Sequence, residues 1–215
     1  MLSDDYSKLA LLCSDRNIEL HAQYGRHFKL RLPKFGRDMC YNPHSGDLIA
    51  VGASNEIYRL NLALGRFQSP LVSDCAEINC VDYSARLELA AVGGVDGRVE
   101  FWDTLANTKA HDLILPQGVQ EQEISSIQFE PTQSLQVAIG TERGKVLLYD
   151  MRYPAPIYTL THHYRMPIKR IRFHESSRKI VTADSKIIKI FNKDDGSLFT
   201  NIEPKAGVND VEVCP

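Results

Sequence analysis

A six-residue motif that recurs every 40 to 46 residues constrains the fold of this chain more than any other feature. Each copy begins with an aliphatic residue, has a second aliphatic residue in fourth position and ends on an aromatic or aliphatic residue. The copies are Ile78–Tyr83, Ile124–Phe129, Ile168–Phe173 and Val208–Val213, and Met39–Tyr41 matches their second half. This period is typical of a WD40-type β-propeller, in which each blade contains four antiparallel strands.

The rest of each repeat has the composition of two further strands. A stretch of small and aliphatic residues follows the motif at Leu48–Gly52, Leu89–Gly93, Gln136–Gly140 and Lys179–Ala183. After a tight turn, apolar and polar residues alternate at Ile57–Asn61, Val99–Asp103, Val146–Asp150 and Ile188–Asn192, with an earlier copy at Ile18–Ala22. Alternation with period two is typical of strands, and no long stretch has a helical period. The sequence therefore predicts an all-β fold.

The dipeptide Trp102-Asp103 is the WD signature itself. The equivalent pairs combine a large apolar residue with a short polar one, and they are Leu60-Asn61, Tyr149-Asp150 and Phe191-Asn192. We expect the large side chains of Trp102, Tyr149 and Phe191 to be buried between neighbouring blades.

The turn before Trp102 contains Asp96, whose carboxylate can accept hydrogen bonds from nearby donors. The other repeats have Ser54, Arg143 and Ser185 at this position. We therefore do not expect a polar network that is repeated in every blade.

The repeats divide residues 1–215 into one propeller domain with four complete predicted blades, at 33–71, 76–116, 122–162 and 166–204. Residues 8–32 are predicted to supply the last three strands of a further blade, and residues 206–215 only a first strand. Either Val208–Val213 pairs beside Lys8–Cys13 and closes a five-bladed ring, or the chain is part of a longer propeller. We favour the second arrangement because both ends fall inside a blade. The isolated chain is then expected to aggregate or to unfold in part.

The residues that could carry chemistry form no recognisable catalytic or metal-binding motif. The five cysteines include no C-x-x-C pair, and reduced thiols fit a cytosolic or nuclear compartment. The seven histidines occur in no H-E-x-x-H context, and we expect them on the surface or in loops. A propeller enzyme would need a ring of inward-facing acids or metal ligands, which the sequence does not indicate. We predict no enzyme activity, cofactor, metal or small-molecule substrate.

Composition argues against a membrane-spanning protein and against a strongly basic protein that binds nucleic acid without specificity. The longest apolar run, Leu9–Cys13, is far shorter than the ~18 residues of a membrane-spanning helix. The net charge of −2 gives no bulk attraction for nucleic acid.

Charge is nevertheless distributed unevenly along the chain. The stretch 26–37 contains Arg26, Lys29, Arg31, Lys34 and Arg37, and the stretch 165–179 contains Arg165, Lys169, Arg170, Arg172, Arg178 and Lys179. The partner-binding residues that we predict are Lys34, Phe35, Arg37, Asp38, Lys169, Arg170 and Arg172. We expect residues 34–38 in a loop on one rim of the propeller, because one aromatic and three charged side chains there are difficult to explain by packing.

Several longer strings resemble one known family. Leu32–Asp38, Val51–Leu62 and Gly65–Phe67 closely resemble the nucleolar protein ten family, also called the essential nuclear protein two family. The match continues through Gly97–Asp103, Gly144–Arg152, Met166–Lys169, Ala183–Lys186 and Asn209–Val211, so the resemblance covers essentially the whole chain.

This resemblance implies a non-catalytic WD-repeat scaffold of the small-subunit processome, which matures 18S ribosomal RNA in the nucleolus of the nucleus. It implies other processome proteins as partners, with pre-rRNA as a further candidate, and family members that are longer than this chain at both ends. The residues alone also permit a stand-alone RNA-binding propeller that uses the stretches 26–37 and 165–179. The steep salt dependence of phosphate contacts distinguishes that alternative from docking on protein.

Overall fold

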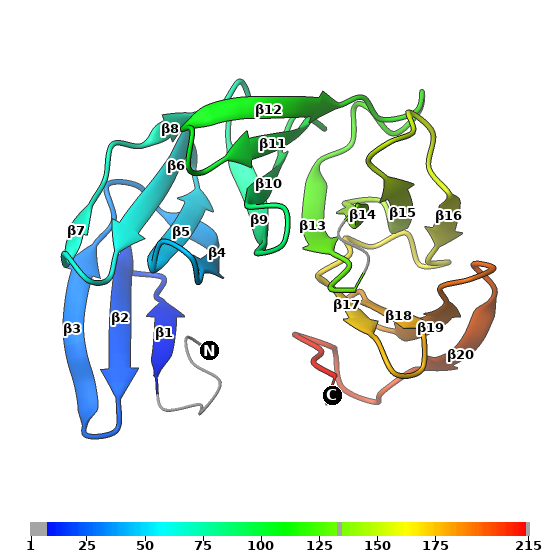
Figure 1. The fold of residues 1–215 in the computed structure, drawn as a ribbon. Coiled ribbons are helices and arrows are strands. Elements are labelled where there is room, and N and C mark those ends of the chain that lie inside the picture. The colour runs from blue at the N-terminus through cyan, green and yellow to red at the C-terminus, as the bar shows by residue number, and fades with distance from the viewer. Residues whose placement is uncertain (1–7, 133–134, 214–215) are drawn as a thin grey trace.

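The computed structural model describes residues 8–132 and 135–213, and every regular element within them is a β-strand. Figure 1 shows sheets that follow one another along an open arc, from blue at the start of the chain to red at its end. The chain is therefore all-β, as the alternation of apolar and polar residues predicts.

The strands of the described residues form five antiparallel sheets, each made of strands that are consecutive in the chain. Sheet 1 contains β1 (Leu9–Leu12), β2 (Asn17–Ala22) and β3 (Gly25–Arg31). Sheet 2 contains β4 (Gly36–Asn42), β5 (Asp47–Gly52), β6 (Ser54–Asn61) and β7 (Arg66–Phe67), and β8 (Leu71–Val72) also pairs with β6. Sheet 3 contains β9 (Ile78–Ser84), β10 (Leu89–Gly94), β11 (Val99–Asp103) and β12 (Thr108–Leu113). Sheet 4 contains β13 (Ile124–Phe129), β14 (Gln136–Thr141), β15 (Lys145–Asp150) and β16 (Tyr158–Thr161). Sheet 5 contains β17 (Arg170–His174), β18 (Lys179–Ala183), β19 (Ile188–Asn192) and β20 (Leu198–Ile202).

Glycines of the second strands β10 and β14 make room for the chain at the start of the next repeat. A Cβ atom added to Gly93 on β10 would lie 2.5 Å from Cγ2 of Ile124, and one added to Gly140 on β14 would lie 2.8 Å from the side chain of Ile168. Both distances are too short for a Cβ atom, so only glycine fits at these two positions. Consecutive sheets are therefore packed directly against each other through these glycines.

Large apolar side chains of the third strands fill the space between sheets. Trp102, Tyr149 and Phe191 are 6%, 0% and 5% exposed, so their expected burial is observed. Each belongs to an apolar cluster shared with the preceding sheet, in which Trp102 accompanies Ile49, Tyr149 accompanies Phe101, and Phe191 accompanies Leu148. The core is consequently a series of intersheet layers.

The segment after β20 differs from the expectation. The motif predicts a first strand at 206–215, but residues 206–213 contain no strand, and residues 214 and 215 lie outside the described residues. The segment still lies beside sheet 5, because the Val208 N–H donates to the Ser185 carbonyl at 2.9 Å. A strand forms only where a neighbouring strand pairs with it through backbone hydrogen bonds. Within the described residues, no second strand lies beside residues 206–213 to make these bonds.

The described residues show no closure of the ring. β1 pairs with β2 alone, and residues 208–213 form no ladder with it. In Figure 1, β1 and the segment after β20 lie at opposite ends of the arc.

Candidate interaction surface

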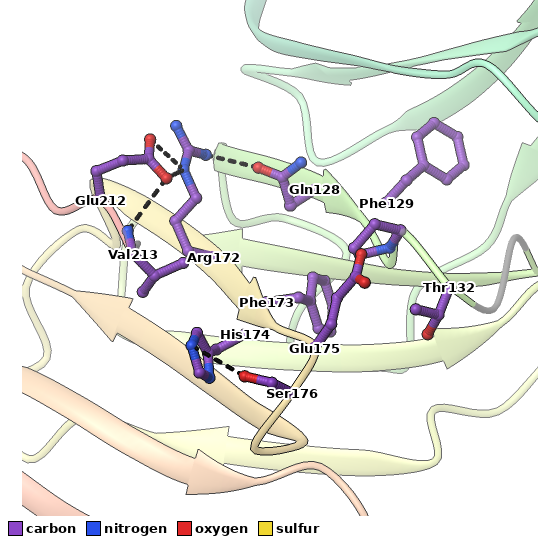
Figure 2. A pocket seen from close by; sticks show the side chains of 11 residues that line it. Gln128, Phe129, Thr132, Arg172, Phe173, His174, Glu175, Ser176, Glu212 and Val213 are labelled. Atoms are coloured by element: carbon purple, nitrogen blue, oxygen red, sulfur yellow. Dashed lines mark hydrogen bonds and ion pairs between the residues drawn. The ribbon is translucent and has the colours of Figure 1, made fainter. Parts of the chain in front are cut away.

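The first strands β4, β9, β13 and β17 lie on the inside of the arc and contact one another in turn (Figure 1). One position of the repeated motif forms a continuous row of polar side chains across this face, made by Asp82, Gln128, Arg172 and Glu212. The Gln128 amide donates to the Asp82 carboxylate at 2.9 Å, and the Arg172 guanidinium donates to Gln128 Oε1 at 2.6 Å and to Glu212 at 2.9 Å. Figure 2 shows Arg172 between Gln128 and Glu212. We call this row the inner ladder.

The second position of the motif joins three of the repeats to the main chain of the repeat that follows. The side chain of Asn79 donates to the Ile124 carbonyl at 3.0 Å. The side chain of Ser125 donates to the Ile168 carbonyl at 2.8 Å. Lys169 donates to the Val208 carbonyl at 2.7 Å. Three different side chains thus make the same contact at the same place in the repeat.

Two carboxylates on this face accept backbone N–H groups from the next sheet. Asp38 accepts the Val81 N–H at 3.0 Å, and Asp82 accepts the Phe129 N–H at 2.7 Å. Desolvation raises the pKa of both groups and outweighs the lowering effect of these donors. For Asp82 the pKa rises to about 7, helped by the nearby charge of Asp38. Asp82 therefore changes its charge near neutral pH.

The Asp82→Asn variant is expected to gain stability relative to the wild type as the pH rises. Folding raises the pKa of Asp82 from 3.8 to about 7, so the stabilising contribution of the protonated form is complete below about pH 4 and is lost as the pH rises through about 7. The amide of the variant does not ionise and retains an oxygen acceptor for the Phe129 N–H. Thermal unfolding at pH 4.5 and pH 8 measures the effect. An equal difference in Tm between the two proteins at both pH values would contradict it.

The structure corrects the rim loop that the sequence predicts at 34–38. Strand β4 begins at Gly36, so Arg37 and Asp38 lie in a first strand. Arg37 forms an ion pair with Glu77 at 2.5 Å and donates to Asn79 at 2.8 Å, both in the next repeat. Lys34 and Phe35 precede the strand and are exposed, with Phe35 58% exposed. The four residues thus divide into an exposed pair and a pair that holds sheets 2 and 3 together.

The second predicted group, Lys169, Arg170 and Arg172, also lies on the inner face. Arg170 donates to Asp210 at 2.8 Å, while Arg172 belongs to the inner ladder and Lys169 contacts the Val208 carbonyl. All three side chains are therefore engaged with neighbouring repeats.

A cavity of about 630 Å³ lies between β13 and β17 beside the inner ladder. In Figure 2, Phe129 and Phe173 lie on one side of it, while Arg172 and Glu212 lie at its edge. His174 at the end of β17 is hydrogen-bonded to Ser176 in the turn that follows, at 3.4 Å. The lining combines apolar and charged groups.

A buried polar network holds sheet 5, and sequence reasoning missed it. His162 Nδ1 lies 2.9 Å from the Asp184 carboxylate, and His162 Nε2 lies 2.7 Å from the Thr182 hydroxyl. The side chains of His162 and Asp184 are both fully buried. His162 lies in a loop, as expected of the histidines, but its side chain is buried and not exposed to solvent.

The environment of this network keeps His162 neutral and Asp184 ionised. Burial lowers the pKa of His162 and outweighs the opposing effect of Asp184. Desolvation alone would raise the pKa of Asp184, but the N–H groups of Lys186 and Ile187, together with His162, lower it. A neutral ring that donates from Nδ1 leaves Nε2 to accept the Thr182 hydroxyl.

Sheet 3 also contains a buried carboxylate whose hydrogen bonds are made by other residues. The Trp102 indole N–H donates to the buried Glu100 carboxylate at 2.9 Å, and the Ser73 hydroxyl donates to the same oxygen at 2.7 Å. Asp96, the predicted turn residue, pairs instead with exposed Arg98 at 3.3 Å.

The polar member of the repeated dipeptide stabilises the turn that follows the third strand. Asp103 accepts the N–H groups of Leu105 and Ala106 at 2.9 and 2.8 Å. Asp150 accepts the Arg152 N–H at 3.0 Å, and Asn192 donates from its amide to Ser197 at 2.6 Å. These contacts are local, so the dipeptide residues stabilise structure at this point of the repeat.

No group of three or more His, Cys, Asp or Glu side chains among residues 8–132 and 135–213 could hold a metal ion. In the same residues, no helix has the length and apolar character needed to cross a membrane.

Comparison with known proteins decides the family. Residues 1–215 match a β-propeller family described as "Nucleolar protein 10-like, N-terminal domain". The chain belongs to this family. As a nucleolar protein 10-like β-propeller domain, it has the fold that the repeat spacing and the resemblance predict.

Individual relatives agree with this family and extend beyond the chain. Nucleolar protein 10 of Xenopus laevis is 44% identical over the whole chain, which covers 32% of that protein. Ribosome biogenesis protein enp2 homolog of Schizosaccharomyces pombe is 37% identical, with 36% of its length covered. Ribosome biogenesis protein ENP2 of Saccharomyces cerevisiae is 34% identical, with 31% covered. The chain thus spans about a third of the length of these relatives, and the name nucleolar protein 10 places the family in the nucleolus.

Proposed function

We propose that this nucleolar protein 10-like domain is a non-catalytic scaffold of the small-subunit processome, required for 18S rRNA maturation. Membership of the family over residues 1–215 carries this proposal, because relatives are named as ribosome biogenesis proteins. The structure supports it through an inner face whose polar groups bind neighbouring repeats, which gives a rigid body for docking. Its partners are other processome proteins.

The alternative, a stand-alone RNA-binding module, is less well supported by the charges. Most basic side chains of the stretches 26–37 and 165–179 have acidic partners. The pairs are Arg26–Glu19, Lys29–Asp15, Arg37–Glu77, Arg170–Asp210, Arg172–Glu212 and Arg178–Asp194. Paired cations release fewer counterions on binding phosphates, so these stretches provide little of the electrostatic drive that RNA binding needs.

The exposed pair Lys34 and Phe35 provides the test. In cells depleted of the endogenous protein, the Lys34→Glu/Phe35→Ala variant is expected to reduce co-sedimentation with pre-ribosomes by about tenfold, which corresponds to a loss of about 1.4 kcal/mol of binding free energy. Precursors of 18S rRNA should accumulate, while the Tm of the purified variant stays unchanged because neither side chain is buried.

Two controls define the outcome. Tyr24→Ala removes another exposed aromatic, 97% exposed in the turn after β2, and should leave co-sedimentation unchanged. Arg37→Glu should instead lower the Tm, because Arg37 bridges to Glu77. Normal 18S rRNA after depletion of the protein would refute the proposed function. Binding of purified protein to single-stranded RNA with a log–log salt slope steeper than about −2, equivalent to about three phosphate contacts, would favour the RNA-binding alternative.

A further inference from the structure

A second cavity, of about 620 Å³, opens on the rim where the turn between β14 and β15 meets the segment between β16 and β17. We call it the rim cavity. The residues of its lining that matter here are Arg143, Gly144, Lys145, His162, His163 and Arg165. None of them belongs to the inner ladder or to the exposed pair Lys34 and Phe35.

The close approach of the two segments brings the basic side chains together. Gly144 has a φ of +72°, and a Cβ atom there would lie 3.1 Å from both Arg165 Cα and the Met166 carbonyl oxygen. The flanking residues Arg143 and Lys145 are consequently held beside Arg165. The His162 N–H also donates to the Gly144 carbonyl at 2.8 Å, which fixes the turn against the segment.

The charge of the lining is strongly one-sided. Arg143, Lys145 and Arg165 carry permanent positive charges, and no carboxylate lines the cavity. The buried Asp184 carboxylate contacts the lining residue His162 and also accepts the backbone N–H groups of Lys186 and Ile187. Glu142 lies 3.6 Å from Arg143 and Glu203 lies 3.9 Å from His163, and these partly exposed pairs are screened by solvent.

The corresponding cavity in the preceding repeat has a different charge. It lies at the turn between β10 and β11, has a volume of about 330 Å³, and is lined by Asp96 and Asp112 as well as Arg98. Gly97 takes the place of Gly144 and also has a positive φ. The geometry of the turn therefore recurs, whereas the concentration of positive charge does not follow from the fold.

We propose that the rim cavity binds a phosphate monoester carried on a phosphorylated serine or threonine of a partner protein. A phosphate monoester carries close to two negative charges at neutral pH, which suits a concave site lined by three cationic residues. A phosphodiester chain would instead require cations spread along a groove with aromatic rings free for stacking. The adjacent ring of Tyr164 lies under the Lys186 ammonium at 5.0 Å and packs on His163.

This inference extends the proposed scaffold function by giving the chemistry of one partner. The test uses two immobilised peptide libraries that differ only in a central phosphoserine or serine. The protein is expected to bind the phosphorylated library at least about tenfold more strongly, with competition by inorganic phosphate. The Arg143→Gln/Lys145→Gln variant should lose this preference, whereas Arg98→Gln, at the corresponding turn of the preceding repeat, should retain it.

Folding and RNA binding are measured with the same proteins. If the double variant has a lowered Tm, the single variant Arg143→Gln replaces it, because that side chain is 68% exposed. Equal binding of both libraries would overturn the inference, as would unchanged binding by the variant. Tighter binding of a uridine oligonucleotide without a terminal phosphate, lost in the same variant, would overturn it in favour of an RNA site. Selective phosphopeptide binding in a protein that does not co-sediment with pre-ribosomes would refute the scaffold function alone.

Discussion

The Asp184→Ala variant is expected to lose about 3–5 kcal/mol of unfolding free energy, because it removes a fully buried carboxylate that accepts three hydrogen bonds, and each donor left unsatisfied costs about 1–3 kcal/mol. The Asp184 carboxylate accepts the backbone N–H groups of Lys186 and Ile187 and contacts His162. Removal leaves these three donors without their acceptor inside the protein. Chemical denaturation followed by circular dichroism measures the loss.

A matched substitution is available in sheet 3. Asp96 lies in the equivalent turn, but its carboxylate pairs with an exposed arginine, so Asp96→Ala should cost less than about 1 kcal/mol. Similar losses for the two variants would show that the buried network contributes no more than a surface ion pair, contrary to the prediction.

The second large effect is expected at Tyr149. This side chain is completely buried among residues of sheets 3 and 4, and Tyr149→Ala should cost about 3–5 kcal/mol through lost contacts and the cavity that remains. The hydroxyl has no hydrogen-bond partner among the described residues, and burial raises its pKa to about 12. The ring therefore contributes the stability, and the hydroxyl does not.

Tyr149→Phe separates these two contributions. The variant keeps the ring and removes a buried hydroxyl that lacks a partner, so its unfolding free energy should equal or exceed that of the wild type. A loss of more than about 1 kcal/mol in this variant would reveal a hydrogen bond to the hydroxyl and contradict the packing explanation.

The fold was predictable because every repeat obeys the same packing requirement. The third strands β11 and β19 have the predicted bounds, since each ends on the repeated dipeptide of a large apolar residue and a short polar residue. Trp102 and Phe191, the large members of these dipeptides, are buried as expected. The segment 206–213 carries the motif as well but forms no strand, because a motif specifies which side chains face inward and does not supply the neighbouring strand.

The polar sites were harder to predict, since they depend on residues brought together from different repeats. The sequence predicts that Arg37 and Asp38 lie in a charged loop. In the structure they contact Glu77 and Val81 of the next repeat. The network around Asp184 was missed because its turn is shorter. Four residues separate the paired residues Ala183 and Ile188, whereas five separate Gly93 and Val99, so Ser185 was aligned with Asp96. An alignment of the repeats that allowed for this difference in turn length would have matched Asp184 with Asp96.

The contacts from Asn79, Ser125 and Lys169 to the following repeat also have a direction, which bears on how the protein is made. In each case the donor lies earlier in the chain than the carbonyl that it binds. Synthesis delivers the chain from its N-terminus, and domains fold as they emerge. Sheets 3 and 4 therefore already display the donor that receives the start of the next sheet, so these sheets can be added one after another while the ribosome is still translating.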